Sequence, residues 1–104
     1  MPGVQELLSP YPPPGPQASA ARAWHIMIRA VAEPGVLPRI LEQLAKRSLV
    51  AEEIQCRKRA SRTGARLAVR IVLVLDDGLM DHICRCWSGT PDVISVLRTA
   101  RDRS

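Results

Sequence analysis

The chain has 104 residues, of which 46% are apolar and 24% are charged. This length allows one domain, and the composition is that of a globular chain, so wholesale disorder is excluded. The sequence has no apolar run of the roughly 18 residues that a membrane-spanning helix needs. The net charge of +5 favours acidic partners, and the small core expected of such a domain favours oligomerisation.

Three cysteines, Cys56, Cys84 and Cys86, are an odd number and cannot form a complete disulfide framework. Residues 1–21 also lack the basic and apolar regions of a signal peptide. Together these features predict a cytoplasmic protein, because thiols stay reduced in that compartment.

The two ends of the chain differ in composition from its middle. Proline is concentrated near the start, and it removes backbone donors and disfavours packed structure. Residues 1–22 are therefore predicted to be a disordered Pro-rich tail, with a docking peptide for an aromatic groove as the alternative. Residues 101–104 are expected to fray, which leaves residues 23–100 as the domain.

The domain alternates between two apolar periodicities, one typical of strands and one typical of helices. Strands are predicted over 24–31, 49–59, 66–75 and 93–99, and helices over 36–47 and from Asp76 to the break at Gly89. The buried stripe of the second helix is predicted to comprise Leu79, Ile83, Cys86 and Trp87. This βαββαβ order predicts an α+β, ferredoxin-like fold, a four-stranded antiparallel sheet with two helices on one face.

Residues that could support catalysis or bind a metal are poorly placed. Both histidines, His25 and His82, fall in regular elements, and no glycine-rich phosphate loop or paired-carboxylate cleft is present. Cys84 and Cys86 follow His82 in sequence, but residues two apart on a helix point away from each other, so Cys84 cannot join the other two at one ion. We therefore predict no catalytic residue, no metal site and no enzyme activity of the chain alone.

The positive charge is concentrated between Glu53 and Asp76, a stretch that contains no acidic residue. We call this stretch the basic hairpin, and its candidate partner-binding residues are Arg57, Lys58, Arg59, Arg62, Arg66 and Arg70. Such a hairpin could bind phosphate, dock on an acidic protein surface or simply be solvated. The βαββαβ order also occurs in RNA-binding modules, but the strand over 66–75 lacks the aromatic residues on which bases stack. Nucleic acid is therefore an unlikely partner.

The turn over 32–37 is the other candidate site. A helix start presents free backbone N–H groups and a partial positive charge, and Gly35 allows close approach of a ligand. Such a turn can bind a carboxylate, including that of an amino acid, although an ordinary tight turn would have the same sequence.

The segments Glu33-Pro34-Gly35-Val36-Leu37, Arg39-Ile40, Lys46-Arg47 and Leu49–Cys56 resemble an ACT domain. The chain is similar in particular to the short, single-domain form of the small regulatory subunit of acetolactate synthase, and the likeness extends over about Ala23–Ala100. The resemblance implies a homodimer that binds a branched-chain amino acid at the subunit interface. The implied effector-binding residues are Ala32, Glu33, Pro34, Gly35, Val36 and Leu37, with Val50 from the neighbouring chain.

The resemblance also implies a large catalytic subunit, which would hold thiamine diphosphate, magnesium and FAD, while this chain would hold no cofactor. Two departures from the family pattern affect the effector site. Ala32 and Val50 stand where the family has Asn, so two polar contacts to the effector are missing. A third departure lies outside the effector site, because Ser48 stands where the family has the glycine that ends its first helix.

We therefore expect a regulatory subunit of branched-chain amino-acid biosynthesis whose feedback by valine is weak or absent. Two alternatives remain open. One is a stand-alone ACT-domain sensor of another amino acid or small ligand, and the other, less favoured, is a nucleic-acid-binding module that uses the basic hairpin.

Overall fold

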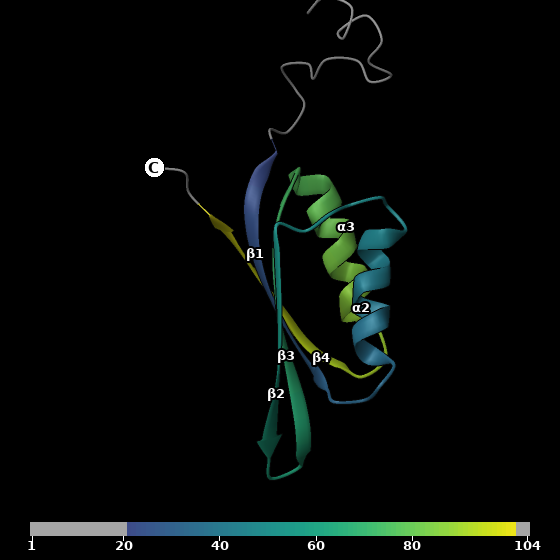
Figure 1. The fold of residues 1–104 in the computed structure, drawn as a ribbon. Helices are drawn as coiled ribbons and strands as arrows, with labels where there is room; N and C mark the ends of the chain where they lie inside the picture. Colours follow the sequence, from purple (N-terminus) through teal and green to yellow (C-terminus); the bar gives the residue numbers. More distant parts are fainter. Residues whose placement is uncertain (1–20, 102–104) are drawn as a thin grey trace, which may run out of the picture.

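The computed structural model describes residues 21–101, and both predicted tails lie almost entirely outside these residues. The elements are β1 (Arg22–Val31), α2 (Val36–Ala45), β2 (Glu53–Ser61), β3 (Gly64–Leu75), α3 (Asp77–Ser88) and β4 (Val93–Arg101). The strands form one antiparallel sheet in the order β2-β3-β1-β4, with both helices on the same face (Figure 1). The predicted ferredoxin-like fold is confirmed.

The core lies between the helices and the two central strands. Alternate residues of β1, from Trp24 to Ala30, face the helices, as do alternate residues of β3 from Val69 to Leu75. The helices contribute a stripe each, formed by Val36, Ile40 and Leu44 of α2 and by Met80, Ile83 and Trp87 of α3. This pattern follows from the period of two in a strand and of 3.6 in a helix.

Several element boundaries differ from those expected from sequence. Arg22 and Arg101, which were expected in the terminal segments, belong to β1 and β4, because Ala23 pairs with Arg101 at the sheet edge. The second strand begins at Glu53 rather than at residue 49, and the preceding residues form a loop. In α3, Met80 is fully buried, whereas Leu79 and Cys86, which were expected in the stripe, are only half-buried.

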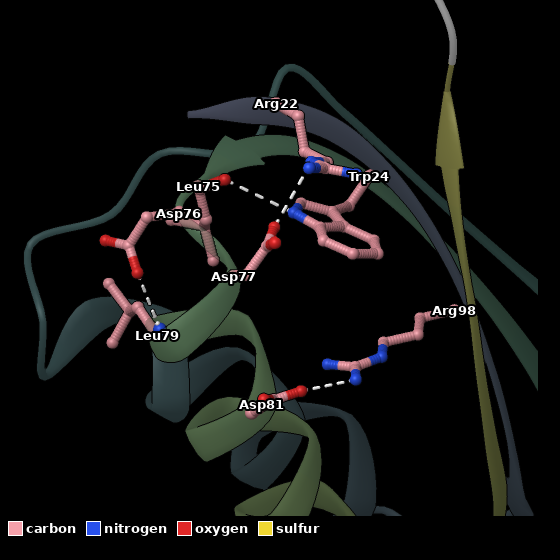
Figure 2. A network of polar contacts seen from close by, with 8 residues as sticks. All are labelled: Arg22, Trp24, Leu75, Asp76, Asp77, Leu79, Asp81 and Arg98. Atoms are coloured by element: carbon pink, nitrogen blue, oxygen red, sulfur yellow. Dashed lines mark hydrogen bonds and ion pairs between the residues drawn. The ribbon is translucent and has the colours of Figure 1, made fainter. Parts of the chain in front are cut away.

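Polar contacts fix α3 on the sheet. The Asp76 carboxylate accepts a hydrogen bond of 2.8 Å from the Leu79 backbone N–H and caps the helix, which begins at Asp77 (Figure 2). The indole of buried Trp87 donates to the Ile40 carbonyl of α2 at 2.8 Å. This bond sets the rotation of α3 and explains why Met80, rather than Cys86, completes the buried stripe with Ile83.

Two arginines of the sheet pair with acids of α3 on either side of Trp24 (Figure 2). Arg22 lies 3.1 Å from Asp77 and Arg98 pairs with Asp81, while both guanidinium groups lie within 6 Å of the centre of the Trp24 ring, at 5.7 and 5.3 Å. Contacts of this kind between cations and an indole face are attractive. They tie β1 and β4 to α3.

The helices cover only part of the sheet. Every residue of β2 is exposed, and the end of β2 and the start of β3 extend beyond both helices (Figure 1). The face of the sheet away from the helices, which we call the open face, has no covering element in residues 21–101. The fold therefore exposes an edge strand and a broad sheet surface.

Ser48 ends the α2 region in a left-handed conformation, with φ of 55°. This conformation lets the Leu49 N–H reach the Leu44 carbonyl at 2.9 Å, a bond typical of a helix end. A residue with a Cβ is strained there, whereas glycine is not. Glycine would therefore fit the backbone at position 48 better than serine does.

We predict that Ser48→Gly stabilises the protein by about 1 kcal/mol, because it relieves this strain. Denaturation by urea, followed by circular dichroism, measures the change in the free energy of unfolding. Ser48→Ala is the matched control and should not stabilise, since alanine keeps the Cβ. Equal stabilisation by both variants would contradict this explanation.

Candidate functional site

The turn between β1 and α2 is held from both sides by backbone hydrogen bonds. The Val31 N–H donates to the Asp92 carbonyl at 2.8 Å, and the Ala32 N–H donates to the Ala65 carbonyl at 3.1 Å. Within the described residues, the N–H groups of Gly35 and Leu37 have no hydrogen-bond partner. A fixed helix start with two available donors is suited to binding a carboxylate.

Arg39 is a residue of this turn that sequence reasoning missed as a functional candidate. Its guanidinium group lies over Gly35, because a Cβ built on Gly35 would stand 3.7 Å from Arg39 Cζ. Its ion pair with Asp92 is long, at 4.0 Å, and both side chains are exposed to solvent. Arg39 can therefore pair with a ligand carboxylate at the helix start. The four-residue spacing from Gly35 was the available signal.

The proposed partner of the turn, Val50, lies at the other end of α2 from the turn in the same chain. A helix of ten residues is about 15 Å long, so the two parts of the predicted effector site do not meet within one chain. Val50 is nevertheless 88% exposed, which is unusual for valine. Residues 32–37 themselves line none of three hollows on the surface of residues 21–101, although Arg39 lines one of them.

The basic hairpin divides between two sides of the molecule. Cross-strand pairing places Arg57 opposite Ala68, Arg59 opposite Arg66 and Gln55 opposite Arg70. Four of the six candidate residues of the basic hairpin therefore lie on the open face, and they are Arg57, Arg59, Arg66 and Arg70. Lys58 lies on the other face, opposite Leu67, and Arg62 is in the turn between the two strands. The sheet adds Arg29 of β1 to the same open face, since it pairs with Ala68. Sequence reasoning missed Arg29 because it lies 28 residues before Arg57.

The cysteines and the histidine of α3 are arranged as helical geometry requires. His82 Nε2 lies 3.8 Å from Cys86 Sγ, to which Arg47 also donates at 3.7 Å. Cys84 faces the other way, beside Asp81 and Arg98. In the described part of the chain, no three histidine, cysteine or acidic side chains are grouped so that they could hold a metal.

Burial raises the pKa of the Cys84 thiol above its ordinary value, although the neighbouring Arg98 acts in the opposite direction. Cys56 is exposed on the edge strand β2. The two thiols therefore differ in accessibility as well as in environment.

Solved structures resemble this fold at low sequence identity. The ACT domain of a GTP pyrophosphokinase from Chlorobium tepidum has a TM-score of 0.60 at 14% identity, over 76% of this chain and 99% of that chain. An uncharacterized protein from Thermotoga maritima has a TM-score of 0.59 at 16% identity, over 79% and 99%. A homoserine dehydrogenase from Thiobacillus denitrificans reaches 0.63 at 19% identity, over 91% of this chain but only 20% of that chain.

No protein-family model and no curated protein sequence matches the chain. The structural likenesses show that it has the ferredoxin-like fold of an ACT domain, as its sequence resemblance predicts. None of the helices among residues 21–101 is long and apolar enough to cross a membrane.

We predict that a thiol reagent at about pH 8 modifies Cys56 before Cys84, because a raised pKa leaves less thiolate on Cys84. Mass spectrometry of tryptic peptides after short exposures measures the order, since cleavage at Arg85 separates Cys84 from Cys86. The unfolded chain is the control and should lose the difference. Faster modification of Cys84 in the folded chain would contradict the prediction.

Proposed function

We propose that the chain is a non-catalytic regulatory subunit that binds an amino acid and activates the large subunit of acetolactate synthase. The observation that carries this proposal is the β1–α2 turn of an ACT fold, in which the N–H groups of Gly35 and Leu37 are available and Arg39 lies alongside. A carboxylate bound there would accept two backbone hydrogen bonds and pair with one guanidinium group. The thiamine diphosphate, magnesium and FAD of the reaction would belong to the catalytic partner.

The exposed edge of β2 supports a homodimer as part of this proposal. The end of β2 and the β1–α2 turn lie at the same end of the sheet, because Ser61 pairs with Gly64 and Ala32 bonds to Ala65. If two β2 edges pair antiparallel about a two-fold axis, the start of one strand lies beside the end of the other. Val50 of the partner subunit would then reach the end of the sheet that carries the turn.

The same arrangement explains why we expect weak feedback. Neither Ala32 nor Val50 offers the polar side chain that the family uses to fix its effector. Each missing hydrogen bond to a charged ligand group would cost about 1.5–3 kcal/mol, or 10- to 150-fold in affinity. Activation can persist without feedback, because docking on the catalytic subunit uses another surface. We assign that docking to the hairpin tip around Lys58 and Arg62, which lie off the open face.

Activation of the catalytic subunit is the direct test of this proposal. Adding the chain to the acetolactate synthase catalytic subunit of the same organism should raise turnover several-fold, and valine, leucine or isoleucine should change that turnover little. Reversing the charge of the tip, with Lys58→Glu and Arg62→Glu, should weaken activation, whereas Arg101→Glu at the far end of β4 is the matched control.

Ala32→Asn tests the effector site separately. This substitution should strengthen valine binding about tenfold by restoring one polar contact, as measured by calorimetry on the isolated chain. Micromolar valine binding by the unmodified chain would contradict the expectation of weak feedback. No activation at saturating chain would instead favour a stand-alone sensor of a different ligand.

Self-association of the chain is tested separately. Ile54, which is 45% exposed on the β2 edge, should contribute to the dimer, so Ile54→Asp should shift the chain to monomer in sedimentation equilibrium. Leu97→Asp on the other edge strand is the matched control, since Leu97 is 64% exposed. A monomer at every concentration would contradict the dimer.

A further inference from the structure

A hollow of about 410 Å³ lies on the open face, at the end of the sheet where the basic hairpin projects. Its volume is within the range of about 300–1,000 Å³ that is usual for small-molecule sites. Six of its lining residues matter for its chemistry, and they are Met27, Arg29, Arg59, Arg66, Ala68 and Ile94. The hollow combines three cations with an apolar floor.

No acidic residue balances these cations within residues 21–101. The ion pairs described there involve Arg22, Arg39 and Arg98 only. On the open face of β2 the one acid is Glu53, which lies opposite Val72 and accepts a hydrogen bond from Gln55. Val72 is six residues from Arg66 along β3, or about 20 Å. The three guanidinium groups therefore form no ion pair with a carboxylate within residues 21–101.

Arg59 and Arg66 lie directly opposite each other on neighbouring strands. Like charges in this position destabilise a sheet, so this pair of arginines lowers the stability of the folded chain. Arg66 is also held in place, since its Nη2 donates to the Thr63 hydroxyl at 2.8 Å. Local rules of stability are most often broken at functional sites, where a ligand offsets the cost.

The charge pattern also indicates which occupant fits. A second copy of the chain, placed on this face by two-fold symmetry, would oppose arginine to arginine. A single-stranded nucleic acid would need aromatic residues for stacking, but Trp24 and Trp87 are both buried against the helices. Arginine binds phosphate through paired N–H donors, and the apolar floor can bury a carbon skeleton.

We propose that this hollow binds a small phosphorylated organic molecule, whose phosphate pairs with Arg29, Arg59 and Arg66 and whose apolar part contacts Met27 and Ile94. This proposal does not require that the β1–α2 turn binds an amino acid or that a catalytic partner exists. It lies on the opposite face of the sheet from the helix start that is proposed for the amino acid.

Calorimetry on the full chain tests the proposal, with phenyl phosphate and inorganic phosphate as probes. Phenyl phosphate should bind at least fivefold more tightly than inorganic phosphate, because its ring covers the apolar floor. Arg29→Gln and Arg66→Gln should each weaken binding about tenfold. Ala68→Leu should abolish binding without changing the charge, because it fills the hollow, and circular dichroism checks that each variant is folded.

Arg62→Gln is the matched control, since Arg62 belongs to the same hairpin but does not line the hollow. It should change the affinity for phenyl phosphate less than twofold. An equal loss in Arg62→Gln and Arg66→Gln would overturn the proposal, because it would mean diffuse attraction by the hairpin. Tighter binding of an eight-nucleotide oligothymidylate, unaffected by Ala68→Leu, would overturn it in favour of nucleic acid. Failure of phenyl phosphate to bind at millimolar concentration would also overturn it.

Discussion

Two short helices cannot cover the sheet on which they pack, and most of the functional surface follows from this mismatch. The helices have ten and twelve residues, or about 15 and 18 Å, whereas β3 has twelve residues and is about 40 Å long. The helices lie over β1 and the inner part of β3, where the buried residues are concentrated. The outer hairpin, the edge of β2 and the whole open face therefore remain exposed.

These exposed parts have different chemistry, and each suits a different kind of contact. The β2 edge presents backbone donors and acceptors, which pair with another strand, although its cations oppose indiscriminate association. The open face presents side chains only, and at one end these are three arginines around an apolar floor. The β1–α2 turn presents backbone N–H groups and one arginine, a combination that suits a carboxylate. One small domain can thus offer separate sites to a second copy, an anion and an amino acid.

The sequence predicts the fold well, because alternation in the strands and helical spacing are local signals. The buried faces of β1 and β3 follow the alternation of their apolar residues, and the buried stripe of α2, formed by Val36, Ile40 and Leu44, follows helical spacing. The rotation of α3 is less predictable, since it depends on the bond from Trp87 to the Ile40 carbonyl, 47 residues away. Met80 replaces Cys86 in the stripe for this reason.

The candidate sites are only partly predictable, because their members come from distant segments. The turn over 32–37 is continuous in sequence and can be singled out as a candidate, whereas Arg39 becomes one only once α2 is recognised as a helix that lays its guanidinium group over Gly35. The basic hairpin was found as a run of charge, which cannot show that Lys58 and Arg62 leave the open face. Nor can it show that Arg29 joins that face, since only strand pairing brings β1 beside β3.

The start of β3 links the two proposed ligand sites. Ala65 accepts the hydrogen bond that anchors Ala32 in the turn, and its neighbour Arg66 lines the hollow on the open face. This part of β3 belongs to the projecting hairpin, where little apolar packing restrains the backbone and local opening is expected to be easiest. A ligand that orders the hairpin from the open face would also restrain the strand end that positions the turn. Because coupling between sites is reciprocal, an amino acid at the turn would in the same measure favour the anion in the hollow.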